Sequence, residues 1–324
     1  MASNEAYARR RKHHASIVLE DFEGGPRLRE IPTPQIGARN ELLIRVQTSS
    51  INGFDVAVAG GRLKGMMEHR FPVVLGKDFA GNVEAIGPGV SRFAIGDQAF
   101  GVLMKPVLGD GTFGEYVTVP EDFGIAKVPA GLALQAAGAL GLTGTAALMS
   151  VEAIAPAAGE TVLISGATGG VGACAVQLAA ARGAQVIATA LPGDQADFVR
   201  SLGATHTVDH RGDLAAAVRA IRPGGLDAVI HLAGDGLQLA ELLVPGGRIA
   251  STLGFGPDQL TGRQIRATSI MAVPGPALLD RLAGDVAAGR LRVPIQRTYR
   301  LEQVPKALAD FASGKLGKLA VTIG

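Results

Sequence analysis

The glycines at positions 166, 169 and 172 are the feature whose residue type and spacing most directly indicate chemistry. Residues 162–178 have the sequence VLISGATGGVGACAVQL, in which an apolar stretch precedes the glycines and an alanine-rich stretch follows them. Glycines at this spacing let the backbone turn sharply, approach an anion closely and pack the following helix tightly, with its N-terminal amides facing phosphates. The segment predicts a cradle for a dinucleotide pyrophosphate, although a nucleotide-free turn can have the same spacing.

The segments on either side of the glycines predict a complete β-α-β unit. An apolar strand is expected over Thr161–Ser165, then a helix up to Arg182 with Gly183 as its C-cap, then a second strand over Gln185–Ala190. This context favours the nucleotide-binding interpretation over a turn without a ligand. The turn residues expected to contact the cofactor are Ala167, Thr168, Gly169, Gly170 and Val171.

Two different patterns along the chain predict two domains. From about Leu132 onward, helical and apolar stretches alternate, which is typical of a doubly wound parallel sheet in an α/β fold. Further strands are expected at His206–Val208, Ala228–Leu232 and Arg248–Leu253, and helices at Gln195–Leu202, Leu214–Ile221 and Leu237–Leu243.

The preceding part, from about Ser16 to Pro129, consists of short β-rich pieces separated by glycine and proline, which predicts an irregular, partly closed β-barrel. The C-terminal piece is expected to complete this domain, with helices over Ala277–Ala288 and Val304–Ala312 and strands near Ile295–Tyr299 and Leu319–Ile323. The predicted division is a tail at 1–15, a barrel domain at 16–130 and 275–324, and a parallel-sheet domain at 131–274.

Composition limits the classes of partner. The net charge of +2, with 19% charged residues among 324, provides no broad cationic field of the kind that nucleic-acid binding requires. No run of about 18 uninterrupted apolar residues occurs, so no membrane partner is expected. The basic run Arg9–His14 is interpreted as a solvated, disordered tail, and because no apolar signal region follows it we expect a cytoplasmic location.

Several segments together resemble one family. The most specific is GKDFAGNVEAIGPGV at residues 76–90, and further matches are INGFD at 51–55, GEYV at 114–117, GLT at 141–143, GGR at 246–248 and GKLGK at 314–318. With the glycine turn, they make nearly the whole chain resemble the medium-chain dehydrogenase/reductase superfamily, and within it the zinc-independent quinone oxidoreductase group. The resemblance implies a GroES-like catalytic domain, an inserted Rossmann domain, and a cleft where a nicotinamide meets its substrate.

The zinc ligands of the superfamily's alcohol dehydrogenases are missing. Those enzymes carry a cysteine near Asn52 and a His-Glu pair where Lys77 and Asp78 stand, and this chain has a single cysteine, Cys174. Tetrahedral zinc needs about three or four such ligands. No metal is therefore expected, and the chemistry that remains is hydride addition from NADPH to a conjugated enone or a quinone. A homodimer or homotetramer is expected.

The resemblance also assigns residues around the nicotinamide. It implies that Asn52 and Asp55 line the pocket, although an Asx turn before a strand explains Asn-Gly equally well. Lys77 could stabilise an oxyanion, but a solvated lysine beside Asp78 is the favoured interpretation, and Asp78 itself is interpreted as structural. Further expected contacts with the cofactor are Thr143, Ala233, Gly234, Leu253 and Lys318. His231 is interpreted as a packed core imidazole.

The choice between NADPH and NADH depends on the end of the second strand. An NAD site usually carries an acidic residue about 20 positions beyond the glycine turn. Here the strand ends without an acid, which favours NADPH, with NADH possible. Gln195 and His210 replace a lysine and a tyrosine of the family, so the 2′-phosphate contacts are assigned to Thr189, Arg200 and Arg211. His210 is also expected to bind the cofactor.

Two other functions remain open. Leu63 stands where enoyl-thioester reductases of the superfamily carry a tyrosine, so protonation of the product enolate is assigned to solvent. The missing tyrosines also suit a nucleotide-binding, crystallin-like protein with little turnover. An enoyl-thioester reductase of a biosynthetic pathway is the other alternative, because the sequence does not distinguish its substrate from a simple enone.

Overall fold

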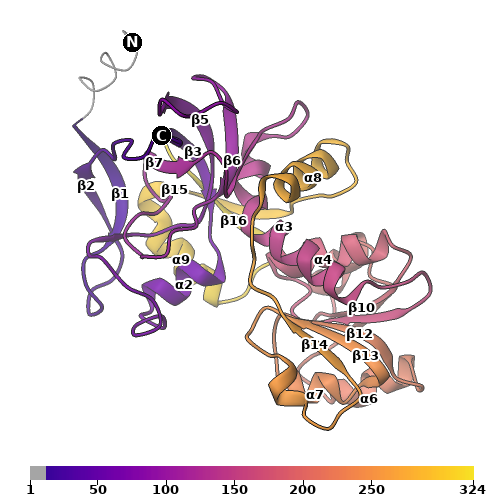
Figure 1. Ribbon diagram of the computed structural model, residues 1–324. Coiled ribbons are helices and arrows are strands. Elements are labelled where there is room, and N and C mark those ends of the chain that lie inside the picture. Colours follow the sequence, from indigo (N-terminus) through magenta and orange to yellow (C-terminus); the bar gives the residue numbers. More distant parts are fainter. Residues whose placement is uncertain (1–11) are drawn as a thin grey trace. The chain divides into compact units, whose positions relative to one another are not determined.

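The computed structural model describes residues 12–324, which form two compact units (Figure 1). Unit 1 contains residues up to Leu142 together with Pro274–Arg290 and Ile295–Gly324, and unit 2 contains Thr143–Val273 and Leu291–Pro294. Residues 1–11 of the predicted tail lie outside the described part, and strand β1 begins at His13, within the stretch that was expected to be tail.

Unit 2 contains a sheet in which every neighbouring pair of strands is parallel. Its order is β11-β10-β9-β12-β13-β14, so the strand order reverses between β9 and β12. Figure 1 shows helix α4 on one face of this sheet and helices α6 and α7 on the other. The predicted doubly wound sheet is confirmed. The strands are β9 (Thr161–Ile164), β10 (Gln185–Thr189), β11 (His206–Val208), β12 (Leu226–His231), β13 (Leu243–Ser251) and β14 (Arg266–Ser269).

The helices of unit 2 follow the strands as expected, but one predicted helix ends too late and one strand of this unit was not predicted. The structure has α4 (Gly170–Ala180), α5 (Asp194–Ser201), α6 (Leu214–Ile221) and α7 (Gly236–Ala240). The helix predicted to reach Leu243 is wrong at its end, because Leu243 already begins β13 and pairs with Leu226. Strand β14 was missed, because it is four mostly exposed residues, RATS, with no apolar alternation to reveal it.

Unit 1 consists of two sheets. A three-stranded sheet has the order β2-β1-β4, and a larger one has the order β15-β16-β3-β5-β6-β8 with β7 also paired to β3. The C-terminal strand β16 lies antiparallel to β3, with Ala320 opposite Ser50. The strands are β1 (His13–Leu19), β2 (Arg27–Pro32), β3 (Glu41–Ser50), β4 (Val73–Val74), β5 (Asp78–Ile86), β6 (Gln98–Val102), β7 (Tyr116–Pro120), β8 (Ile125–Lys127), β15 (Ile295–Arg300) and β16 (Lys318–Thr322).

The core of unit 1 lies between these sheets and the helices α2 (Gly53–Ala59) and α9 (Val304–Ala312), while helix α8 (Pro276–Ala287) packs against β8. Its fully buried members include Ile17, Ile44, Phe79, Phe113 and Val321, which come from segments far apart in the sequence. The turn at Asn52 precedes helix α2, so the expectation of a following strand is wrong. Helix α2 presents Val58 to the core and brings Asn52 and Asp55 into the interior.

Helix α3 (Leu134–Ile154) is continuous across the division between the two units, which falls between Leu142 and Thr143. Its first turns pack closely on unit 1: a Cβ on Gly138 would lie 2.7 Å from Thr48 Cγ2, and one on Gly141 would lie 2.8 Å from Val102 Cγ2. By length and composition α3 is the one described helix that could cross a membrane. However, 78% of its most apolar window is buried inside the protein, as in the core helix of a globular fold.

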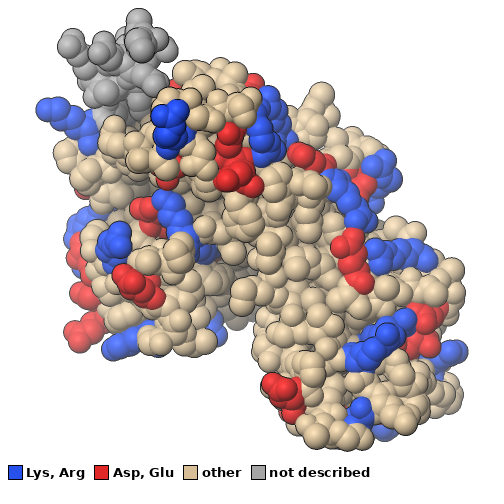
Figure 2. Space-filling view, viewed as in Figure 1, with Lys and Arg blue, Asp and Glu red and all other residues tan. Residues whose placement is uncertain are grey.

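Charges of both signs are interspersed over the face of the molecule drawn in Figure 2. The ion pairs of the described residues include Arg200–Asp197 and Lys306–Asp310. The face carries no extended field of one sign, which agrees with the net charge of +2.

Candidate functional site

The glycine turn of unit 2 is shaped by close backbone contacts. Strand β9 ends at Ile164 and α4 begins at Gly170, with Gly169 as its N-cap. Gly166 has φ +67°, in the left-handed region that favours glycine. A Cβ on Gly172 would lie 2.3 Å from the carbonyl oxygen of Gly166 and 2.6 Å from Ala167 Cα. Because no side chain fits there, the first turn of α4 sits directly on the turn that precedes it.

A cavity of about 590 Å³ opens from this turn within unit 2. It lies at the carboxyl ends of the strands, next to the point where the strand order reverses, which is where ligands bind in open α/β sheets. Five residues predicted to contact the cofactor line it: Thr168, Thr189, His210, Ala233 and Gly234. The cavity wall continues along α6 and α7 through Asp213, Leu214, Ala215, Arg219, Asp235, Gln238, Glu241 and Leu242.

Thr189 connects β10 to the glycine turn. Its hydroxyl accepts a hydrogen bond from the Gly166 amide at 2.9 Å, so the last residue of β10 is held beside the turn. This is the end of the second strand, where an NAD-binding protein of this fold usually carries its acidic residue. A neutral hydroxyl stands here instead, so the end of β10 carries no carboxylate to repel a 2′-phosphate.

The two arginines assigned to the phosphate are engaged elsewhere and do not line the cavity. Arg200 donates to the Thr207 hydroxyl at 2.9 Å and pairs with Asp197. Arg211 forms an ion pair with Asp209 at 3.0 Å. Leu253, also assigned to the cofactor, follows β13 with 56% of its surface exposed and lies outside the cavity lining.

Arg219 is the arginine that the structure brings to the cavity, and the sequence analysis missed it. It lies four residues after Ala215 on α6, and this spacing places both on one helix face. That periodicity was the available signal. It pointed to an amphipathic helix, but only the fold shows which face meets the cavity.

The three carboxylates that line the cavity are each balanced by a local partner. Asp213 is the N-cap of α6 and accepts the Ala216 amide, and Asp235 is the N-cap of α7 and accepts two amides. A carboxylate at a helix N-terminus is stabilised by the helix dipole. Glu241 pairs with Arg263 at 3.5 Å. No described carboxylate forms an ion pair with Arg219, so its guanidinium is free to meet an anion.

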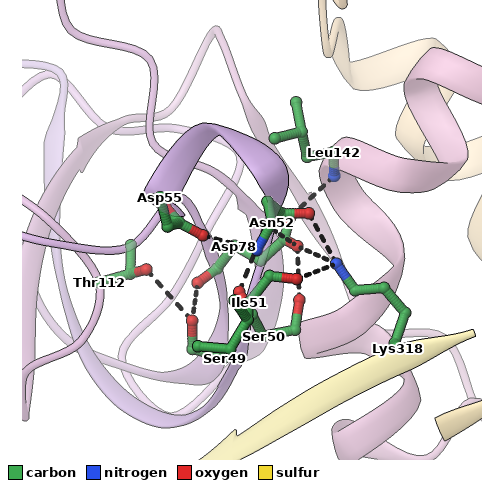
Figure 3. Close-up of polar contacts among 9 residues, drawn as sticks. All are labelled: Ser49, Ser50, Ile51, Asn52, Asp55, Asp78, Thr112, Leu142 and Lys318. Atoms are coloured by element: carbon green, nitrogen blue, oxygen red, sulfur yellow. Dashed lines mark hydrogen bonds and ion pairs between the residues drawn. The ribbon is translucent and has the colours of Figure 1, made fainter. Parts of the chain in front are cut away.

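In unit 1 a second group of predicted residues forms a buried polar network around Asp78 (Figure 3). The Asp78 carboxylate accepts hydrogen bonds from Ser50 Oγ at 2.6 Å, Asn52 Nδ2 at 2.9 Å and the Leu142 amide at 2.8 Å. Lys318 Nζ lies 3.4 Å from Asp78 Oδ2 and donates to Asn52 Oδ1 at 2.6 Å. The Asp78 side chain is fully buried and that of Lys318 is 3% exposed. Lys318, assigned to the cofactor, is therefore an internal ion-pair partner of unit 1.

Asp55 and Lys77 are the strongly perturbed titratable groups near this network. Burial, with a smaller contribution from the neighbouring Asp78, raises the pKa of Asp55 to about 7 against the opposing effect of the hydrogen bond from the Asn52 amide. Burial lowers the pKa of Lys77 below its ordinary value. The Lys77 ammonium lies 4.7 Å from the centre of the Phe54 ring, and the residue is only 8% exposed. The preferred expectation of a solvated lysine does not fit this burial.

Thr143 is buried in α3, at the first position of unit 2, and makes a polar interaction of its own. Leu63 packs against the core of unit 1, so its position offers no proton donor.

The residues of unit 1 do not fit a zinc ion. Within residues 12–324 no three His, Cys, Asp or Glu side chains gather as a metal site would require. At the network itself, the ammonium of Lys318 already contacts Asp78 and Asn52. A fixed positive charge in this position would repel a second cation.

Two family models match this chain: the alcohol dehydrogenase GroES-like domain over residues 38–130 and the zinc-binding dehydrogenase over residues 202–321. A mycocerosic acid synthase-like polyketide synthase of Mycolicibacterium smegmatis is 33% identical over 329 residues, covering 95% of this chain. This chain spans only 15% of the length of that relative.

Relatives of similar length also match. The chloroplast envelope quinone oxidoreductase homologue of Arabidopsis thaliana is 27% identical, over 90% of this chain and 91% of the relative. The solved quinone oxidoreductase of Coxiella burnetii has a TM-score of 0.85 at 29% identity, over 97% of this chain and 100% of that one. The chain belongs to the medium-chain dehydrogenase/reductase superfamily and is quinone oxidoreductase-like. Its GroES-like and Rossmann-type folds are thereby confirmed, and membership implies a nicotinamide cofactor.

Proposed function

We propose that the chain is an NADPH-dependent reductase that transfers hydride to a conjugated enone or a quinone without a metal. The observation that carries the proposal is the cavity of unit 2, in which the glycine turn, the neutral Thr189 and the unpaired Arg219 line one space. A guanidinium binds phosphate by paired hydrogen bonds, whereas the absence of an acid at the end of β10 removes the usual ribose contact of NADH.

The proposal gives residues of this chain the following roles. The amides of the glycine turn hold the pyrophosphate, and the cavity beyond Thr189 accepts the adenosine half of the cofactor. The cofactor, when bound, supplies the hydride. In unit 1 the Lys77 ammonium has no described hydrogen-bond acceptor, so it can donate a hydrogen bond to an oxyanion that develops on the substrate. The Asp55 carboxylate interacts electrostatically with this ammonium and opposes the lowering of the Lys77 pKa by burial.

The first test is binding and turnover by the purified protein. Calorimetry with NADPH and NADH measures the preference, and oxidation of NADPH is then followed with a panel of quinones and enones. We expect NADPH to bind more tightly and at least one acceptor to be reduced. Tight binding without any turnover would instead support the crystallin-like alternative, and no binding of either dinucleotide would refute the proposal.

Arg219→Ala tests the phosphate contact, with Arg211→Ala as the matched control. We expect Arg219→Ala to weaken NADPH binding about tenfold or more, the loss of one charge-assisted contact, while NADH binding changes little. Arg211→Ala should change neither affinity, because that guanidinium is paired with Asp209. Equal loss of both dinucleotides in Arg219→Ala would contradict a role in phosphate recognition.

A second candidate is an enoyl-thioester reductase. It is favoured by the polyketide synthase relative, which aligns with 95% of this chain at higher identity than the quinone oxidoreductase homologue. The discriminating experiment compares a 2-enoyl thioester with the corresponding simple enone at equal concentration. A higher kcat/KM for the thioester would select this candidate over the first.

A further inference from the structure

Three polar side chains connect the strand ends around the cavity of unit 2. Ser165, which follows β9, accepts the amides of Leu232 at 3.0 Å and Ala233 at 3.3 Å. His231 is the last residue of β12, and Ser251 is the last residue of β13. All three are buried, although the loops that they hold reach the surface. The loop after β12, residues 232–235, contributes Ala233, Gly234 and Asp235 to the cavity lining.

The hydrogen bonds of His231 identify its tautomer. Its Nε2 lies 3.0 Å from the carbonyl oxygen of Gly234, which can only accept, so Nε2 carries the proton. Its Nδ1 lies 3.0 Å from Ser251 Oγ. A neutral imidazole with its proton on Nε2 has a bare Nδ1, so the Ser251 hydroxyl donates to it, and the same oxygen accepts the Leu253 amide at 3.0 Å. One imidazole therefore connects Gly234 on the first loop to Leu253 on the second.

The position of the ring is fixed by packing. Phe255 meets the His231 ring edge-on, with centroids 5.9 Å apart. Phe255 is itself confined, since a Cβ on Gly236 would lie 2.5 Å from its ring. Gly234 has φ +86°, so the loop turns through a left-handed residue at the point where the imidazole binds its carbonyl. The hydrogen bond from His231 holds the Gly234 carbonyl, whereas Ser165 holds the amides of Leu232 and Ala233 at the start of the same loop.

We propose that His231 is a positioning residue for the dinucleotide, which holds the cavity loop 232–235 through Gly234 and the loop 252–254 through Ser251. The inference rests on the proposed function, since it requires a nucleotide in the cavity of unit 2. It assigns a role to a residue that the sequence indicated only as packed core. The imidazole acts through the loop backbones and does not itself react.

Three substitutions separate the two hydrogen bonds. In His231→Gln the amide nitrogen can reach the place of Nε2 and donate to Gly234, but nothing replaces Nδ1. In His231→Asn the amide oxygen can take the place of Nδ1 and accept from Ser251, but nothing reaches Gly234. His231→Leu fills much of the space and makes neither bond. His206→Leu, at an exposed histidine in β11 of the same unit, is the control.

The readouts are the Kd for NADPH by calorimetry, KM and kcat for a quinone acceptor, and thermal unfolding of each variant. We expect His231→Asn and His231→Leu to raise the Kd for NADPH about tenfold, the effect of one lost hydrogen bond, with the KM of the acceptor little changed. His231→Gln should stay within about threefold of wild type by keeping the Gly234 contact. His206→Leu should equal wild type.

Two results would overturn the inference. One is a wild-type Kd in all three variants, or a loss of thermal stability in them without any rise in Kd, since either would leave His231 a packing residue only. The other is a nitrogen NMR spectrum of the wild-type imidazole showing the proton on Nδ1. If His231→Leu does not fold, the Kd values of His231→Gln and His231→Asn for NADPH decide whether the hydrogen bond to Gly234 positions the dinucleotide. Failure of the wild type to bind any dinucleotide would instead refute the proposed function.

Discussion

Lys318 and Asn52 are in direct contact in the interior of unit 1, with Lys318 Nζ 2.6 Å from Asn52 Oδ1. The contact connects the start of the last strand, β16, to the N-cap of helix α2. Asp78 completes the group, because its carboxylate accepts a hydrogen bond from Asn52 and forms an ion pair with Lys318. The buried charge of Asp78 is neutralised by Lys318, and together with Asn52 the pair connects three segments that are distant in the sequence.

Removal of the Lys318 charge should therefore destabilise the folded protein. Lys318→Met leaves the Asp78 carboxylate buried without its cation, and we expect the free energy of unfolding to fall by about 3–5 kcal/mol. Lys306→Met, which breaks an exposed pair with Asp310, should cost less than about 1 kcal/mol. Denaturant unfolding measures both variants. Equal, small effects would show that Asp78 is satisfied by its hydrogen bonds alone.

Gly172 should tolerate no side chain. In Gly172→Ala the new Cβ meets the Gly166 carbonyl oxygen, so α4 must move away from the turn, and we expect dinucleotide binding to be lost. Gly284 in α8 has open space around it, and Gly284→Ala should leave binding intact and stabilise the helix by about 0.5–1 kcal/mol. Calorimetry with NADPH and thermal unfolding test both. Unimpaired binding in Gly172→Ala would show that the turn does not contact the cofactor.

Asp55 should make stability depend on pH near neutrality. Its pKa is about 7 in the folded protein and 3.8 is its ordinary value, so the folded protein keeps a proton that the unfolded chain has released between these values. The free energy of unfolding therefore falls as pH rises from about 4 to 7, by roughly 2–4 kcal/mol. Asp55→Asn cannot ionise and can still accept the Asn52 amide.

The measurement is urea unfolding of wild type and Asp55→Asn at intervals from pH 4 to 8. We expect the stability of the variant relative to wild type to increase across this range and to level off above pH 7. His14 acts in the opposite direction, because burial lowers its pKa to about 4, but it contributes equally to both proteins. Parallel pH curves for the two proteins would mean that Asp55 titrates normally.

Lys77 should affect turnover more than cofactor binding. Lys77→Met removes the ammonium above Phe54, and we expect kcat to fall about 10²-fold, as for loss of one donor to a developing oxyanion, with the Kd for NADPH unchanged. Lys64 is the matched control, since it lies 5.0 Å from the Phe22 ring but is exposed, and Lys64→Met should leave kcat unaltered. A wild-type kcat in Lys77→Met would show that its ammonium does not stabilise a developing oxyanion.

Local pattern was sufficient for the elements that carry a strong periodic or steric signal. Strand β9, the glycine turn and α4 follow from an apolar run, from glycines where no Cβ fits and from an alanine-rich helix, all determined within one short segment. The doubly wound sheet follows from repetition of such units. Where the signal was weak the prediction failed, as for the polar edge strand β14 and for helix α2 after Asn52.

The sequence by itself determined the class of fold, the family and the glycine turn that joins β9 to α4, because these depend on residues close together in the chain. Only the tertiary structure decided which cation faces the cavity, Arg219 and not Arg200 or Arg211, because this depends on the helix face that packs against the sheet. It also decided that Lys318 serves Asp78 inside unit 1 and that His231 connects two loops. Hydrogen bonds between distant segments exist only once the chain has folded, so spacing along the sequence cannot reveal them.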